Sequence, residues 1–298
     1  MTRVAHLSVT IATLDRPEAL ARCLDALLSG AVLPGEVIVV DQSRDDATKT
    51  IIERRQGGAV PIVYVRQQRR GLSASRNAAL AQVSHPIVAV TDDDCVPDPG
   101  WIEVIERAFD SPTAPHALTG RVLPLGPEVP GTYAVATRES PVGTEFSAKA
   151  LPWLIGSGNN FAVKRDCFAR VGGCDERLGV GSPGKAAEDI DLFYRLLRAG
   201  ARIRYEPDAL IYHQRQSQAQ RMASRWSYGY GTGAFCSMWF RRGDLYALGI
   251  LGYWLCWQCR HLAVAIGRRQ WLEAYQRWLS VRGTSGGLIY GLRVRQTA

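Results

Sequence analysis

The sequence of 298 residues lacks the paired cysteines of a disulfide-stabilised secreted domain. Its seven cysteines are odd in number and scattered, at positions 23, 95, 167, 174, 236, 256 and 259. Such usage predicts free thiols in a reducing compartment. Cys256 and Cys259 match the C-x-x-C pattern, but they lie in an apolar stretch without a second pair. We therefore predict neither a zinc site nor a redox centre there.

Apolar runs long enough to cross a bilayer are also missing. The best candidate, residues 245–259, has 15 residues with Gln258 as its one polar side chain, and Arg260 follows it. A membrane span needs about 20 apolar residues. The apolar run from Leu7 is interrupted by Asp15 and Pro17 too early for a signal peptide. We therefore expect a cytoplasmic protein.

Acidic residues are scarce in residues 214–298. This region holds 12 arginines, six of the eight tryptophans and two acids, Asp244 and Glu273, for a net charge of +10. Residues 1–213 hold 24 basic and 26 acidic residues, for a net charge of −2. The arginine and tryptophan content favours helices that lie on an anionic membrane face. A helical subdomain packed on the preceding domain and a homodimer interface are the alternatives, whereas nucleic acid is disfavoured because the aromatic residues lie within apolar runs.

Strands alternate with helices along residues 1–213. The apolar segments 6–13, 36–43, 61–67 and 86–94 predict strands, and 16–30, 45–56, 72–83 and 99–109 predict helices. Residues 111–213 add a return strand at 117–124, a strand and short helix within 159–173, a helix at 186–200 and short strands at 202–213. This order predicts an α/β domain with a mostly parallel sheet covered by helices on both faces. We expect residues 1–213 to form this domain and residues 214–298 to form a helical extension.

Carboxylates follow several of the predicted strands. Asp92, Asp93 and Asp94 end the fourth strand, while Asp15 and Asp41 follow the first and second. The carboxyl ends of parallel strands share one edge, where ligands bind. Alternation along a strand would turn Asp92 and Asp94 to one side and Asp93 to the other. Two neighbouring carboxylates require a cation, and Mg²⁺ or Mn²⁺ suits them; an acidic turn exposed to solvent is the alternative.

Three further features complete the pattern. Arg76 lies in the first turns of the helix at 72–83, where a helix N-terminus and an arginine together suit phosphate. Glu188 and Asp189 begin the helix at 186–200; they complement the helix dipole or supply a general base. His213 follows an apolar strand and is either a packing residue or a metal ligand.

Taken in order, these segments resemble glycosyltransferase family 2. The similarity covers residues 6–213 and rests on the motifs VTIATLDRP, VIVVDQS, GLSASRNAAL, VTDDDCVPDPGW, GSGNNFAVKRDCFARVGGCDERLG and EDIDLFYRLLRAG. The resemblance implies a GT-A fold, a nucleotide-diphosphate sugar donor, a divalent metal and inversion at the anomeric carbon by single displacement. It also implies that the catalytic domain, residues 1–213, binds the nucleotide sugar through about residues 1–110 and the acceptor through about residues 111–213. Many members carry Tyr-Asn where this chain carries Leu14-Asp15. The resemblance therefore does not extend to an aromatic side chain stacked on the nucleotide base.

The same resemblance implies roles for individual residues. Asp189 of the Glu188-Asp189 pair would be the catalytic base. The metal would be held by Asp94 and His213, with Asp92 as a further ligand, because members differ in which aspartate of this motif binds it. The resemblance also implies contacts with the nucleoside, the phosphates and the sugar of the donor. The residues that would make these contacts are Ala12, Thr13, Asp15, Asp41, Arg76, Asp92, Asp93, Asn159 and Asn160.

Substrates and alternatives can be stated only by class. We expect a UDP- or dTDP-sugar donor and a glycan or lipid-linked sugar acceptor, used at the inner face of the cell membrane in envelope polysaccharide or glycolipid synthesis. A sugar nucleotidyltransferase would need a glycine-rich first loop, and IATLDRP contains no glycine. A non-catalytic, membrane-associated partner that retains a sugar-nucleotide pocket is disfavoured by the presence of both Asp94 and Asp189.

Overall fold

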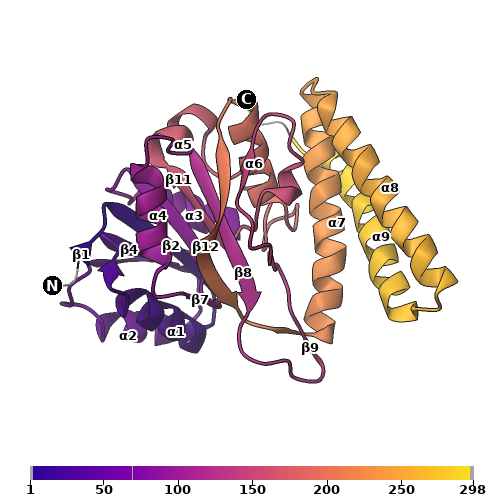
Figure 1. Cartoon of the computed structure of the whole chain (residues 1–298). Coiled ribbons are helices and arrows are strands. Elements are labelled where there is room, and N and C mark those ends of the chain that lie inside the picture. The colour runs from indigo at the N-terminus through magenta and orange to yellow at the C-terminus, as the bar shows by residue number, and fades with distance from the viewer. Residues whose placement is uncertain (1–2, 69, 296–298) are drawn as a thin grey trace.

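Four parallel strands give the central sheet the edge on which the site is built (Figure 1). The computed structural model describes residues 3–68 and 70–295. The nine-stranded sheet has the order β10-β12-β8-β11-β6-β2-β4-β5, and β7 pairs with β12. The parallel strands are β6 (Ile87–Asp92), β2 (Leu7–Thr13), β4 (Glu36–Asp41) and β5 (Ile62–Arg66).

The other half of the sheet corrects the prediction of a mostly parallel arrangement. Strand β11 (Asn160–Lys164) runs antiparallel to β6 and to β8 (Ala117–Pro124). It enters from a long irregular segment without a crossover helix, and a parallel pairing needs such a crossover. Strand β12 (Ile203–His213) is one continuous strand rather than several short ones, and it lies parallel to β8. Short strands β10 (Thr144–Phe146) and β7 (Cys95–Pro97) pair antiparallel with β12.

Helices cover both faces of the sheet, as predicted. Within β4, Val37 and Val39 pack on one face while Ile38 and Val40 pack on the other, and all four are fully buried. This explains why the strands of the first half are apolar throughout. One face is covered by α1 (Pro17–Leu28), α2 (Ala47–Glu53) and α4 (Trp101–Asp110). The other is covered by α3 (Leu72–Leu80), α5 (Arg165–Val171) and α6 (Glu188–Arg198).

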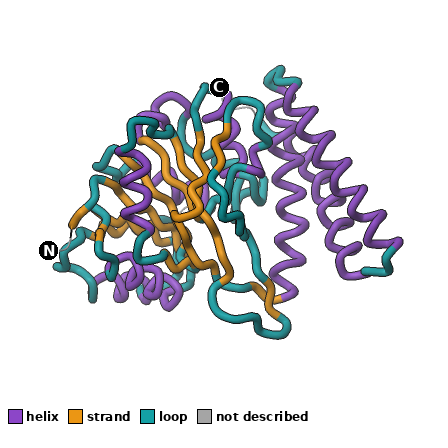
Figure 2. Tube along the Cα trace, viewed as in Figure 1, coloured by secondary structure: helices purple, strands orange, loops and turns teal. Residues whose placement is uncertain are grey.

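Small elements complete this part of the chain (Figure 2). Strands β1 (Arg3–Val4) and β3 (Val32–Leu33) form a two-stranded parallel ribbon. A short 3₁₀ helix, η1, spans Pro152–Leu154. Strands β9 (Thr132–Tyr133) and β13 (Gln216–Ser217) pair antiparallel and so fasten the long loop after β8 to the beginning of the C-terminal region.

Residues after β13 form the predicted helical extension. Helices α7 (Gln218–Arg241), α8 (Tyr246–Gly267) and α9 (Trp271–Arg293) lie beside the α/β part, with α7 nearest to it (Figure 1). Glycines let α7 and α9 approach closely, because a Cβ at Gly287 would lie 1.8 Å from the carbonyl oxygen of Tyr230. Among the described residues, no helix has both the length and the apolar character needed to cross a membrane.

Polar contacts fix α7 to the α/β part. The indole nitrogen of Trp239 donates to Asp191 of α6 at 2.8 Å, and the hydroxyl of Tyr194 donates to Asp244 at 2.6 Å. Tyr194 also packs edge-on against Phe235 of α7 within a shared apolar cluster. The extension is therefore a helical unit packed on the preceding domain, which was one of the alternatives for its basic sequence.

Candidate active site

Two arginines hold the aspartate cluster that ends β6. Asp93 accepts hydrogen bonds from Thr13 at 2.8 Å and from Arg16 at 3.1 Å, and Arg16 also contacts Asp94 at 2.9 Å. Asp92 instead faces Arg76, at 3.2 Å. The predicted alternation is therefore wrong, because the strand ends at Asp92 and the next two residues form a turn. Burial, reinforced by the charge of Asp94 and opposed by Arg16, raises the pKa of Asp93 to about 6.

The guanidinium of Arg76 lies at the centre of the site. It is 5% exposed and contacts Asp92, Glu188 at 3.0 Å and the carbonyl oxygen of Gly158 at 2.6 Å. Its charge therefore neutralises two carboxylates that come from a strand end and a helix start. The predicted contact with donor phosphates stays a prediction. The carboxylates and the carbonyl bind both terminal nitrogens, and the buried Nε has no partner among the described residues.

The two carboxylates that begin α6 have different surroundings. Glu188 is buried against Arg76, and its pKa is raised to about 7 by burial and by the charge of Asp189, in opposition to Arg76. Asp189 is half-buried, and one of its oxygens accepts from the backbone of Ile190 at 2.8 Å. A Cβ at Gly158 would lie 2.8 Å from the other oxygen, so a glycine is needed beside it. Asp189 is thus the carboxylate with an oxygen left for a substrate.

His213 and Asp94 form the candidate metal site. Pairing of β12 with β7 sets His213 opposite Cys95, next to Asp94. Ligand atoms of these three residues all lie within 4.8 Å of one another. The Nδ1 of His213 contacts the carbonyl oxygen of Gln214 at 2.8 Å, which leaves Nε2 toward Asp94 at 3.5 Å. Burial and the charges of Asp92 and Asp94 raise the pKa of the Cys95 thiol well above its usual value, so the oxygen and nitrogen ligands suit a hard cation better.

Asn159 and Asn160 take opposite roles. The amide of Asn160 accepts from the indole of Trp101 at 2.9 Å and donates to the carbonyl oxygens of Arg121, at 2.9 Å, and Ala209, at 2.8 Å. Its side chain is therefore part of the core, in place of the predicted sugar contact. The amide nitrogen and oxygen of Asn159 are buried, and neither has a hydrogen-bond partner in the described part of the chain. Such orphaned polar atoms are rare unless a ligand satisfies them.

Residues predicted for the nucleoside line the ends of β2 and β4. Asp41 is fully buried and accepts from the backbone of Ser43 at 2.8 Å and from the hydroxyl of Tyr64 at 2.9 Å. Ala12 pairs in register with Asp92 across the β2–β6 ladder. Asp15 is exposed in the left-handed region, at φ 54°, and accepts from the backbone of Arg44 at 2.9 Å. The expected residues thus share one edge, although Asp41 is already bonded within the fold.

Sequence comparison decides the family. Residues 8–172 match the model of the glycosyl transferase family 2, and residues 141–231 match the model described as glycosyltransferase like family 2. The chain belongs to glycosyltransferase family 2. The predicted resemblance to this family is confirmed. The matched residues contain the aspartate cluster, Arg76 and both asparagines.

Named relatives and a solved structure agree with this assignment. The pre-mycofactocin glycosyltransferase of Mycobacterium tuberculosis is 30% identical over 213 residues, covering 67% of this chain and 42% of the relative. The O-antigen chain rhamnosyltransferase WbaN of Salmonella anatum is 25% identical over 219 residues, covering 70% and 65%. The chain therefore spans less than half the length of the mycobacterial relative and just under two thirds of the Salmonella one.

The fold is similar to that of the mannosyltransferase PcManGT from Pyrobaculum calidifontis, solved in complex with GDP-Man and Mn²⁺. The TM-score is 0.64 at 19% identity, over 98% of this chain and 88% of that one. This likeness confirms the expected GT-A fold.

The sequence did not predict two residues of the site in this family 2 domain. Arg16 follows β2 and binds two of the three clustered aspartates. Tyr228 belongs to α7, and although its ring is partly exposed, desolvation and the charges of Asp189 and Glu188 raise its pKa to about 12. The position of Arg16 directly after a strand was a usable signal. Nothing local marked Tyr228, because tertiary packing of α7 brings it to the site.

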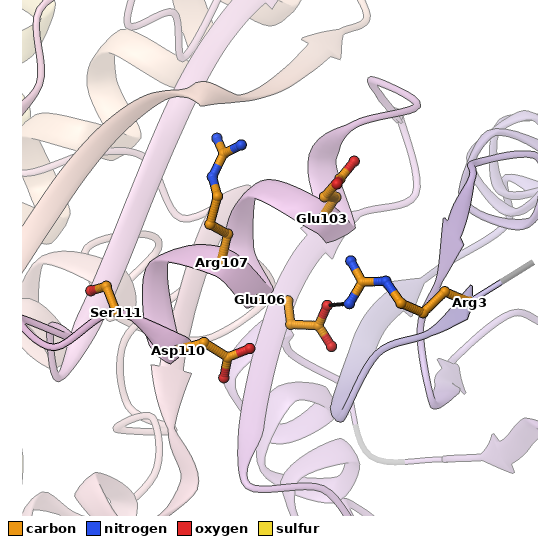
Figure 3. Close-up of a pocket in the computed structure, with 6 residues that line it drawn as sticks. All are labelled: Arg3, Glu103, Glu106, Arg107, Asp110 and Ser111. Atoms are coloured by element: carbon orange, nitrogen blue, oxygen red, sulfur yellow. Dashed lines mark hydrogen bonds and ion pairs between the residues drawn. The ribbon is translucent and has the colours of Figure 1, made fainter.

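One cavity of the family 2 domain lies away from these residues. It has a volume of about 430 Å³ and is formed by Arg3 of β1 and by residues of α4 (Figure 3). Arg3 forms an ion pair with Glu106 there, and basic and acidic side chains are mixed along its lining. The cavity includes none of the predicted site residues.

The two asparagines give a matched test of the site. Asn160→Ala should lower the free energy of unfolding by about 2–4 kcal/mol, because it removes three buried hydrogen bonds and leaves Trp101 unpaired. Asn159→Ala should change stability by less than about 1 kcal/mol, since it removes no bond within the fold. Urea denaturation monitored by tryptophan fluorescence measures both. Equal losses of stability would contradict the assigned roles.

Proposed function

We propose that the chain transfers a sugar from a nucleotide-diphosphate donor to a hydroxyl of a glycan or lipid-linked acceptor, with a divalent metal and with inversion at the anomeric carbon. The observation that carries this proposal is the convergence of an open carboxylate, Asp189, with the Arg76-bound Asp92 and the Asp94–His213 pair at one sheet edge. Each group comes from a different element, and the fold brings them together.

The ligand set supports a hard metal ion. The carboxylate of Asp94 and the imidazole of His213 would hold Mg²⁺ or Mn²⁺. Asp92 is the further candidate because its carboxylate interacts electrostatically with Asp94 and His213. When bound, the ion would neutralise the charge of a leaving diphosphate.

The base is the residue whose surroundings leave an oxygen accessible. Asp189 would accept the proton of the attacking hydroxyl through the oxygen that lies beside Gly158. Glu188 is bound to Arg76 and acts as a positioning residue for the start of α6. A single base that activates the acceptor hydroxyl is what direct displacement with inversion requires. The orphaned amide of Asn159 supplies a donor and an acceptor for a sugar hydroxyl.

The names of the relatives support the proposed substrate class. One is a pre-mycofactocin glycosyltransferase and another an O-antigen chain rhamnosyltransferase, and the similar solved structure contains GDP-Man. These names support a nucleotide-sugar donor and a role in envelope polysaccharide or glycolipid synthesis. We propose UDP or dTDP as the donor nucleotide. No observation favours a sugar nucleotidyltransferase or a non-catalytic partner.

Asp189→Asn separates chemistry from binding. The substitution keeps the size of the side chain but removes the base, so turnover should fall by about 10²–10⁴-fold. Affinity for a nucleoside diphosphate with Mn²⁺, measured by calorimetry, should remain within about twofold. Asp94→Asn is the matched control and should weaken metal-dependent nucleotide binding itself. Full turnover in Asp189→Asn, tested with UDP-, dTDP- and GDP-sugars and a membrane extract as acceptor, would refute the base assignment.

We also propose that the helical extension contacts an anionic membrane surface from the cytoplasmic side. Trp271 and Trp278 of α9 and Tyr253 of α8 are strongly exposed aromatic residues. Arginines lie over neighbouring rings, including Arg282 at 5.3 Å from the centroid of Trp278. Exposed aromatic rings beside a net charge of +10 suit a helix that lies in the headgroup region.

Vesicle flotation tests this contact. The full chain should float with phosphatidylglycerol vesicles at low salt and much less with phosphatidylcholine vesicles, because part of the attraction is electrostatic. Paired Trp271→Ser and Trp278→Ser should reduce flotation, while Val129→Ser, on an exposed loop of the α/β part, should not. A chain that stays unbound to both vesicle types and sediments as a dimer would favour the homodimer alternative.

A further inference from the structure

A second cavity lies between α7 and the long loop after β8. It has a volume of about 310 Å³, and residues 134–137 line one side. The other side consists of Arg221, Ser224, Arg225 and Tyr228, whose spacing of three and four residues sets them on one face of α7. The β9–β13 pairing holds this loop against the helix, and the guanidinium of Arg221 lies 4.6 Å from the centroid of the Tyr133 ring.

The arginines of this cavity form no ion pair with a carboxylate of the described structure. Neither Arg221 nor Arg225 forms an ion pair with residues 3–68 or 70–295, and the Arg225 guanidinium makes no hydrogen bond there. Arg221 donates only to the amide oxygen of Gln276, at 3.3 Å. Burial, together with Arg221 and Arg277, lowers the pKa of Arg225, in opposition to Tyr228 and Glu273. The carboxylate of Glu273 is itself paired with Arg277, at 3.1 Å. By contrast, the buried Arg76 and the partly buried Arg195 contact carboxylates.

The cavity adjoins the proposed base. Tyr228 lines it, and the same residue feels the charges of Asp189 and Glu188. One turn further along α7, a Cβ at Gly231 would lie 2.6 Å from the carbonyl carbon of Ala186, two residues before Glu188. A group bound by these arginines would therefore lie next to the start of α6.

We propose that Arg221 and Arg225 bind the phosphate of a phosphate-linked acceptor and so direct its hydroxyl to Asp189. This inference rests on the proposed function and adds the chemical class of the acceptor. Arginine matches phosphate because its planar fork donates two parallel hydrogen bonds. The hydroxyl of Tyr228, which no described residue engages, adds a further donor. The donor diphosphate would lie at Asp94 and His213, so the cavity serves the other substrate.

Binding measurements on the full chain test the proposal with three probes: a short-chain prenyl phosphate, inorganic phosphate, and phosphatidylglycerol vesicles. Wild type should bind the prenyl phosphate, and Arg225→Gln should weaken that binding by at least about tenfold, because a charge-assisted hydrogen-bond pair is lost. Arg225→Lys should lose less, since it keeps the charge. Arg54→Gln, which removes an exposed arginine of the α/β part at the end of α2, is the matched control and should bind as wild type does.

Several results would overturn the proposal. If the Arg225→Gln variant has the thermal midpoint of wild type and binds prenyl phosphate equally well, Arg225 is not part of a phosphate site. If wild type binds inorganic phosphate as tightly as prenyl phosphate, the cavity is not an acceptor site. If Arg225→Gln weakens vesicle binding as much as prenyl phosphate binding, the arginines belong to a general membrane-binding surface. Weaker binding of nucleoside diphosphate with Mn²⁺ in Arg225→Gln would assign the cavity to the donor. A wild-type protein that turns over none of the UDP-, dTDP- and GDP-sugars would instead refute the proposed function while leaving Arg225-dependent binding intact.

Discussion

The buried guanidinium of Arg76 is the contact on which the site depends. It joins the end of β6, the segment before β11 and the first turn of α6 through Asp92, the carbonyl of Gly158 and Glu188. A buried carboxylate without a partner costs several kcal/mol, so the two acids could not remain ionised in these positions without a cation. The same contact fixes the beginning of α6 and thereby the position of Asp189.

Arginines also explain how the chain tolerates three consecutive aspartates. The sequence predicted that a metal ion would balance them, and the structure adds Arg16 and Arg76 as cations supplied by the protein itself. Asp94 is held by the half-exposed Arg16, which has room to move, whereas Asp92 is held by a buried arginine. This difference favours Asp94, beside His213, as the aspartate that changes its partner when a metal and a diphosphate bind.

Local patterns predicted the first half of the fold well, because its parallel strands are mostly apolar and a helix follows each of them before the next strand of the set. The antiparallel entry of β11 could not be read from the sequence, since it depends on the path of a long loop. Asn159 and Asn160 are adjacent and chemically identical in sequence, and only the packing of α4 and β12 distinguishes a core amide from an orphaned one. Likewise, Tyr228 and Arg225 join the site through long-range packing of α7.

The most direct test of this account is the stability of Arg76→Met, compared with wild type by urea denaturation at pH 8 and pH 5. Arg76 opposes the rise in the pKa of Glu188, which is about 7 in its presence, so its removal raises that pKa further, and the stability of Arg76→Met relative to wild type falls as the pH rises above 7. At pH 5 Glu188 is largely protonated in both native proteins, so the difference is smaller there. The account predicts a loss of about 3–5 kcal/mol at pH 8 and a clearly smaller loss at pH 5. A loss that is the same at both pH values, or below about 1 kcal/mol at pH 8, would contradict it.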